Sequence, residues 1–242
     1  MAATLYAVPA SHPCACVERA LQLKAIEYRR IDLPPVAHKP VQKALFGGST
    51  VPGLVLDGRK ILGSLHIIRA LEEKVAEPRL LPADDKERKS VQLAEGWGDE
   101  VLQPLVRRVI WAALARAPAA TTSYNEGSKL QVPAPLARLS APLIALVERR
   151  INAASDLNVR ADLAHLDSHL GRVDRWIEHQ VIGGERPNAA DLQIGAGLRL
   201  LLTIDDVARW AGSRPATQLA FKWFSLYPGH VPSGVLPAAW LP

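Results

Sequence analysis

The chain has 242 residues, 48% of them hydrophobic and 22% charged, with a formal net charge of +5. This composition is typical of a soluble globular protein and allows one or two domains with a full core. The basic residues are spread along the chain, which disfavours a nucleic-acid-binding surface. No apolar run reaches the length of about 20 residues that a membrane helix needs. No signal peptide is visible, so we expect a cytoplasmic protein without nucleic-acid or membrane partners.

The two cysteines, Cys14 and Cys16, stand two positions apart. This number and spacing exclude a disulfide framework. On a helix, residues two apart point to different faces, and the sequence has no second cluster of Cys and His. We therefore expect no metal site.

The first part of the chain alternates between strand and helix patterns. Residues 4–8 and 28–33 are strand candidates, and residues 14–25 between them have helical periodicity. Two parallel strands joined by a helix form a right-handed βαβ unit. An irregular or briefly helical stretch follows and ends near Phe46.

A hairpin is the next predicted feature. Asp57-Gly58 lies between two apolar pairs within residues 51–62, and both turn positions tolerate positive φ. Pro52 cannot donate to a ladder and is expected at the beginning or edge of its strand. Ser64 is expected to cap a following helix. The predicted order is therefore βαβ followed by ββα.

The chain from residue 84 onward is predicted to be entirely helical, after a linker over residues 79–83. Residues 118–135 contain several Pro and Gly and form an unusually long loop, which is often functional or mobile. Residues 227–242 form a tail expected to lie across the surface. The apolar spacing predicts helices over about 91–113, 139–151, 163–177, 192–203 and 216–226.

Asn188 precedes an unusually apolar helix, and Asp191 follows three residues later. This is a variant capping box with Asp in place of Glu or Gln. A helix this apolar is expected to be buried on most sides, where unpaired donors are costly. We therefore interpret Asn188 and Asp191 as a structural cap.

The segment Ser11-His12-Pro13-Cys14 joins the first predicted strand to the first predicted helix. A helix N-terminus has unpaired N–H donors and about half a positive charge, so it stabilises an anion. We interpret that anion as the thiolate of a small thiol cofactor. Cys14 itself is most simply a small buried hydrophobe. Core packing is the main interpretation for the tryptophans, although Trp97 and Trp111 are candidates to line a pocket.

These features together resemble the serine-type cytosolic glutathione transferase superfamily. The resemblance implies a thioredoxin-like domain over residues 1–78, a linker over 79–83 and an all-helical domain over 84–242 that supplies an electrophile pocket. It also implies a homodimer. It is carried by Leu5-Tyr6, Ser11-His12-Pro13-Cys14, residues 21–28, Val51-Pro52, Ser64, and Gly183 with Asn188-Ala189-Ala190-Asp191.

The resemblance also implies roles for particular residues. Ser11 would donate a hydrogen bond to the glutathione sulfur, and Val51, followed by a cis proline, would pair with the cysteinyl part. Ser64 would hold the γ-glutamyl carboxylate, and His38 or Lys39 would reach the glycyl carboxylate. The implied cofactor-binding residues are Ser11, Cys14, Lys39, Thr50, Val51, Pro52 and Ser64.

The sequence departs from the family pattern in two places. Gly63 stands where the family has an acidic or amide side chain that binds the γ-glutamyl ammonium. Either another residue supplies this contact, or glutathione binds weakly, or the site prefers another low-molecular-weight thiol. The second departure is the additional helical length over residues 118–155.

The expected chemistry is attack of an ionised thiol on a bound hydrophobic electrophile. Lowering a thiol pKa from about 8.5 by about 2 units requires roughly 2.7 kcal/mol. A hydrogen bond to the anion gives about 1.5–3 kcal/mol, and a helix N-terminus gives about 0.3–2 kcal/mol. The reaction would be conjugation, or a related thiol-dependent cleavage or isomerisation.

Two other functions stay open at this point. One is a thiol–disulfide or deglutathionylating oxidoreductase that uses Cys14, since Ser11-His12-Pro13-Cys14 has the form of a Cys-x-x-Cys motif with its first Cys replaced. The other is an interaction module that kept the fold and lost the site, an option that Gly63 favours.

Overall fold

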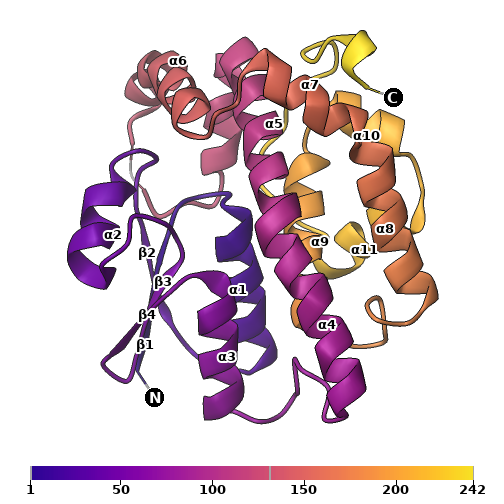
Figure 1. Ribbon diagram of the computed structural model, residues 1–242. Coiled ribbons are helices and arrows are strands. Elements are labelled where there is room, and N and C mark those ends of the chain that lie inside the picture. The colour runs from indigo at the N-terminus through magenta and orange to yellow at the C-terminus, as the bar shows by residue number, and fades with distance from the viewer. Residues whose placement is uncertain (1, 131, 242) are drawn as a thin grey trace.

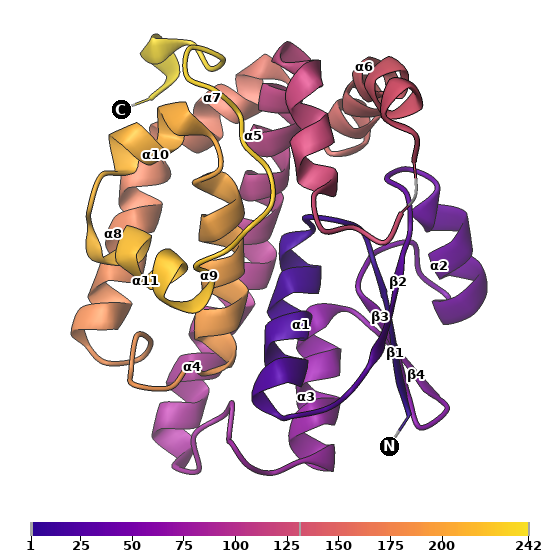
Figure 2. The ribbon, with the colours of Figure 1, turned by 180° about the vertical axis from the view of Figure 1, so that it is seen from behind.

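The computed structural model describes residues 2–130 and 132–241 (Figure 1). Met1, Gln131 and Pro242, which belong to the N-terminal segment, the loop and the tail predicted above, lie outside the described residues. A sheet with its helices forms one side of the molecule, and a helical layer formed by the later part of the chain lies beside it (Figures 1 and 2).

The sheet has four strands in the order β2-β1-β3-β4. β1 pairs in parallel with β2, and β3 is antiparallel to both β1 and β4. Alternate residues of β1 are buried, as expected for a strand whose one face lies on the core. The predicted βαβ unit and hairpin are therefore confirmed. The strands are β1 (Ala3–Ala7), β2 (Arg29–Asp32), β3 (Gly53–Leu56) and β4 (Arg59–Leu62).

Three helices cover the two faces of this sheet. α1 (His12–Leu23) and α3 (Ser64–Lys74) lie between the sheet and the helical layer, and α2 (His38–Phe46) lies on the opposite face (Figure 1). Phe46 of α2 meets Tyr6 of β1 edge to face, with ring centroids 5.5 Å apart. α1 thus packs against both the sheet domain and the helical layer, which places its N-terminus near their junction.

The start of α3 differs from the sequence prediction. The N-cap is Gly63, with φ +89°, and Ser64 is the first residue of the helix. A positive φ of this size favours glycine, because an L side chain is strained there. Glycine at position 63 therefore suits the turn from β4 into α3.

The helical layer begins with one nearly continuous run, as the spacing over 91–113 predicts. α4 (Asp85–Trp97) passes into α5 (Gln103–Arg116) through one π-helical stretch, η1 (Gly98–Leu102). A Cβ at Gly98 would lie 3.0 Å from Cγ of Gln193, so this stretch brings the run very close to α9. Single π turns of this kind often mark functional regions of a helix.

The remaining elements follow in chain order. The tail runs along the back of the helical layer (Figure 2), where Val231 and Leu236 are buried. No helix in the described residues is both long enough and apolar enough to cross a membrane. The elements are η2 (Pro118–Asn125), α6 (Ala134–Ile151), α7 (Asp156–Ala164), α8 (Leu166–Glu178), α9 (Ala189–Leu201), α10 (Asp205–Ala211), α11 (Pro215–Trp223) and η3 (Ala238–Trp240).

Several of these elements correct the sequence prediction. The spacing over 163–177 predicts one helix, but α7 and α8 meet at His165, where φ is −96° and ψ is 0°. α7 packs on α5 and α8 packs on α11, so the break redirects the chain. α10 has only seven residues, too few for an apolar period to be recognised. Residues 118–135, predicted to be a loop, contain the 3₁₀ helix η2, anchored by the buried Tyr124.

α9 is the centre of the helical layer, and nearly all of its residues are buried. The Asn188 side chain accepts hydrogen bonds from the N–H groups of Ala190 and Asp191, at 3.0 and 3.1 Å. The Asp191 carboxylate accepts from the N–H of Asn188 at 3.0 Å and from the N–H of Gly183 at 2.7 Å. These bonds satisfy donors that would otherwise be buried without partners.

The leucines of α6 face away from the core, although amphipathic spacing usually marks the buried face of a helix. Leu139, Leu143 and Leu146, whose spacing predicts this helix, are 80%, 65% and 60% exposed. The buried positions are Ala141, Ala145 and Glu148. The helix lies above the ends of the sheet strands, and no further layer covers its outer face in the described part of the chain (Figure 1).

Candidate active site

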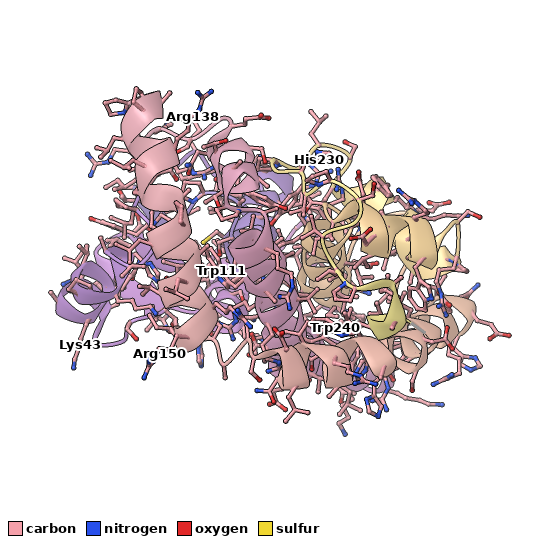
Figure 3. All side chains as sticks on the ribbon, turned by 90° about the horizontal axis from the view of Figure 1, so that it is seen from above. Lys43, Trp111, Arg138, Arg150, His230 and Trp240 are labelled. Carbon is pink, nitrogen blue, oxygen red and sulfur yellow. The ribbon has the colours of Figure 1, made fainter. Side chains whose placement is uncertain are left out.

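A cavity of about 750 Å³ lies where the sheet domain, α5, η2 and α6 meet. The sheet domain contributes the turn after β1, the start of α2 and the segment before β3. The helical layer contributes mainly apolar side chains, among them Ile110, Trp111 and Leu114 of α5. Figure 3 shows Trp111 beside α6, whose opposite ends carry Arg138 and Arg150. A cavity of this size suits a small organic ligand.

Ser11 lines this cavity and is the N-cap of α1. Its backbone is extended, with φ −70° and ψ 118°, and its hydroxyl makes no capping bond to the helix. The next residues begin the helix with Pro13, which has no N–H to satisfy. The Ser11 hydroxyl is therefore placed beside a helix N-terminus without being used by it.

Cys14 lies behind Ser11, one turn into α1, and is 1% exposed. Burial raises the pKa of the Cys14 thiol to about 12, although hydrogen bonds to the Ser11 side chain and the Val8 backbone oppose this shift. Burial also raises the pKa of Cys16 well above its ordinary value. Because the thiolate is the nucleophilic form, neither thiol is activated in this structure.

The Val51–Pro52 bond is cis, and the carbonyl of Pro52 accepts a hydrogen bond from the N–H of Gly63 at 2.9 Å. Thr50 and Val51 line the cavity, whereas Pro52 lies outside its lining. Ser64 is 3% exposed and also lies outside the lining. The segment before β3 therefore borders the cavity up to Val51.

Lys39, at the start of α2, lies on the cavity wall beside His38. Its ammonium is 3.9 Å from the buried carboxylate of Glu148 on α6. Burial lowers the pKa of His38, so its imidazole is neutral near pH 7. The structure thus brings Ser11, Lys39, Thr50 and Val51 to one cavity and leaves Cys14, Pro52 and Ser64 behind its wall.

Polar side chains that the sequence analysis did not single out also line this cavity. Arg108 forms a bidentate ion pair with Asp162, at 2.6 and 2.8 Å. The Tyr124 hydroxyl is 2.6 Å from the hydroxyl of Thr203, and burial raises the pKa of Tyr124 to about 12. Arg107, the residue before Arg108, belongs to the same set. The pair Arg107-Arg108 in a predicted helix was a visible signal, but helical periodicity does not show which side chain reaches a cavity.

The two tryptophans named as pocket candidates have different positions. Trp111 lines the cavity. Trp97 instead packs against Trp176 of α8, with ring centroids 5.2 Å apart, away from the cavity. Trp97 is the last residue of α4, directly before η1, whereas Trp111 lies more than two turns into α5.

The comparisons with known proteins agree with this architecture. Residues 5–79 match the family model described as the glutathione S-transferase N-terminal domain. A comparison with curated proteins finds no match. Among solved structures, a glutathione S-transferase from Rhodospirillum rubrum F11 is 20% identical, with a TM-score of 0.60, over 92% of this chain and 86% of that one.

Two further glutathione S-transferase structures are similar. The protein from Sinorhizobium meliloti 1021 is 18% identical, with a TM-score of 0.59, over 99% of this chain and 97% of that one. The protein from Methylobacterium radiotolerans JCM 2831, in complex with glutathione sulfonate, is 18% identical, with a TM-score of 0.55, over 92% of this chain and 90% of that one.

The fold is a thioredoxin-like domain followed by a helical region, the architecture of the glutathione S-transferases. Residues 5–79 carry that superfamily's N-terminal domain, so the resemblance inferred from the sequence is confirmed. These matches do not bear on the serine-type subclass, which rests on Ser11.

Proposed function

We propose that this protein is a serine-type glutathione transferase, which ionises a bound thiol beside Ser11 and directs it at a hydrophobic electrophile. The observation that carries the proposal is the placement of Ser11, at the N-terminus of α1, in one cavity with Lys39, Thr50 and Val51. The α5 side of the same cavity is apolar and would hold the electrophile. The complex of a similar structure with glutathione sulfonate supports glutathione as the thiol.

The mechanism requires little from the protein beyond these groups. The Ser11 hydroxyl has a rotatable proton and can turn from Cys14 toward a cofactor sulfur. It would then donate to the thiolate, which the α1 N-terminus also stabilises. The thiolate attacks an electrophilic carbon, a carbon–sulfur bond forms, and the leaving group departs with its electron pair. The cavity wall excludes water and orients the two reactants.

Gly63 leaves one contact of the cofactor without an assigned partner, because glycine has no side chain for an ammonium. We therefore propose glutathione as the principal cofactor and keep another low-molecular-weight thiol as an outcome of the test. Lys39 is the proposed partner of a cofactor carboxylate, since its only nearby anion among the described residues is Glu148 at 3.9 Å.

The oxidoreductase alternative is disfavoured by the burial of Cys14 and its raised pKa. The interaction-module alternative predicts no thiol binding. Calorimetry with a panel of small thiols, followed by turnover of 1-chloro-2,4-dinitrobenzene, tests the proposal. We expect glutathione to bind and to be conjugated. Binding of no thiol, or activity that is lost in Cys14→Ser and kept in Ser11→Ala, would contradict it.

The domain limits (1–78, 79–83 and 84–242), the homodimer and the cytoplasmic location remain proposals. α3 ends at Lys74 and α4 begins at Asp85, which agrees with a linker over 79–83. Light scattering coupled to size-exclusion chromatography would measure the mass of the assembly. A mass of one chain at micromolar concentration would contradict the homodimer.

A further inference from the structure

Arg107 is a charged side chain on a largely apolar cavity wall. Its neighbour Arg108 is neutralised by Asp162. Glu148, the one carboxylate among the described residues that line the cavity, already accepts from the N–H of Val36 and the amide of Asn152. Within the described residues, the Arg107 guanidinium has no hydrogen bond and no ion pair. Its five N–H donors are therefore available to a ligand in the cavity.

The electrostatic surroundings of Arg107 also favour a ligand at this position. Burial is the largest cause and lowers the pKa of Arg107; the charge of Asp99 opposes this shift, the positive charge of Arg108 adds to it, and Glu148 opposes it least, so the pKa is lowered overall. A guanidinium stays protonated even so. Arg107 is partly buried, and a charge removed from water without a partner is costly, so this position favours an anionic ligand.

His12 is a second, independent observation at the same place. It lines the cavity next to Ser11, is 2% exposed, and its Nε2 has no hydrogen-bond partner in the described part of the chain. Burial, and then the charge of Arg107, lower the pKa of His12 to about 3. The imidazole is therefore neutral at pH 7, lies within the electrostatic reach of Arg107, and keeps a buried Nε2 without a partner.

We propose that Arg107 and His12 form an anion subsite that selects electrophiles carrying a carboxylate on an apolar body. The designation of the ligand as an electrophile rests on the proposed function, whereas the subsite itself does not. Arg107 would hold the carboxylate with two parallel N–H···O bonds, and the apolar α5 side chains would pack on the rest of the molecule. A carboxylate of the thiol cofactor is the other source of the same chemistry.

The first experiment measures binding in the absence of any thiol. Calorimetry compares 3,5-dinitrobenzoate with 3,5-dinitrobenzamide, which share the ring and differ in charge. One hydrogen bond to a charged group is equivalent to roughly 10- to 150-fold in affinity. We therefore expect the unaltered protein to bind the benzoate at least about 10-fold more tightly than the amide.

Three variants assign that preference to a residue. Arg107→Gln should reduce the ratio of the two affinities to about 1–3, and Arg107→Lys should restore part of it, because lysine keeps the charge and loses the bidentate geometry. Arg160→Gln removes the same charge from the exposed surface of α7, outside the cavity, and should leave the ratio unchanged. No preference in the unaltered protein, or an equal preference in Arg107→Gln, overturns the proposal.

The second experiment separates the two sources of the carboxylate. Turnover is compared for 4-chloro-3,5-dinitrobenzoate and its carboxamide, and glutathione affinity is measured for each variant. We expect Arg107→Gln to lower the kcat/KM ratio of acid to amide about 10-fold or more. Loss of glutathione affinity with an unchanged acid-to-amide ratio assigns Arg107 to the cofactor and overturns the proposal. If turnover fails while the binding preference depends on Arg107, the proposed function fails and the anion subsite stands.

Discussion

The backbone N–H of Val36 donates a hydrogen bond to the buried carboxylate of Glu148 at 3.1 Å, although the two residues are 112 positions apart. Glu148 lies on α6, and Val36 lies in the segment that leads into α2. The same carboxylate accepts from the side chain of Asn152 at 3.0 Å. This contact joins the helix that covers the cavity to the domain that carries Ser11.

Glu148→Ala should weaken that connection. It leaves the part-buried N–H of Val36 without its acceptor, which costs about 1–3 kcal/mol, while the Asn152 amide keeps its bond to the backbone carbonyl of residue 148 at 2.8 Å. We expect a lower free energy of unfolding in urea and faster hydrogen exchange at the Val36 amide. Glu126→Ala removes an exposed carboxylate from the same region and is the matched control. Equal stability of the two variants would show that the contact does not hold α6 in place.

Ser11→Ala should raise the pKa of the bound thiol. The hydroxyl favours the thiolate by about 1.5–3 kcal/mol, so its loss raises that pKa by about 1 to 2 pH units. The kcat/KM profile for conjugation should therefore move to higher pH by the same amount. Ultraviolet absorbance of the thiolate in the binary complex measures the pKa directly. Cys14→Ser is the control, and a profile that moves equally in both variants would contradict the role of Ser11.

Gly63 can be tested by restoring the side chain that the family has there. Gly63→Glu and Gly63→Ala share the strain of an L residue at φ +89°, about 1–2 kcal/mol. A Cβ at this position meets only Nδ1 of His66, at 3.7 Å, so a side chain has room. We expect Gly63→Glu to bind glutathione about 10-fold more tightly than Gly63→Ala. Equal affinities would mean that another group already binds the ammonium.

Cys14 and Cys16 should resist alkylation in the folded protein. Both thiols are buried, and burial raises both pKa values, so the reactive thiolate is rare at pH 8. Mass spectrometry after iodoacetamide treatment should show no modification until urea unfolds the chain. Rapid modification of Cys14 in the native protein would revive the oxidoreductase interpretation.

Acid should release the C-terminal tail. Burial alone would raise the pKa of Asp206, but the N–H groups of Gly234, Leu236 and Val235 donate to its carboxylate and lower that pKa overall. Because the folded pKa lies below the unfolded value of about 3.9, this contribution to stability is complete above about pH 4 and is lost as the pH falls through the folded pKa. The protection factors of the three amides, which are corrected for the intrinsic pH dependence of exchange, should therefore fall in acid.

Asp206→Asn is the matching variant for the tail. Its amide cannot carry the negative charge that these three donors favour, so the same amides should exchange faster at neutral pH and show a weaker dependence on acid. Protection that is identical in the variant at pH 7 would contradict an anchoring role for this carboxylate.

The sheet domain could be predicted closely because its signals are local. Asp57-Gly58 specifies a tight turn, and the apolar alternation around it specifies two short strands. The capping pair of Asn188 and Asp191 was equally visible, because a capping box spans only three residues. The helix ends were predicted less accurately. The break at His165, for example, depends on which neighbours α7 and α8 contact.

The cavity could be predicted only in part. Ser11 and Val51 were found because each lies in a short motif with a defined backbone geometry. Arg107 and His12 were not assigned to the site, because their meeting depends on how α1 and α5 pack. The orientation of α6 could not be predicted either, since amphipathic spacing predicts a helix without stating which side faces the core.

The reversed orientation of α6 has a consequence for how this protein can change its ligand. The helix presents the small residues Ala137 and Ser140 to the cavity, together with Leu136 and Ile144, whereas Leu139, Leu143 and Leu146 lie on the outside. Substitutions at these two small residues would resize the compartment without disturbing the tightly packed centre around α9. A single peripheral helix could thus diversify the accepted molecules while the rest of the architecture keeps its stability.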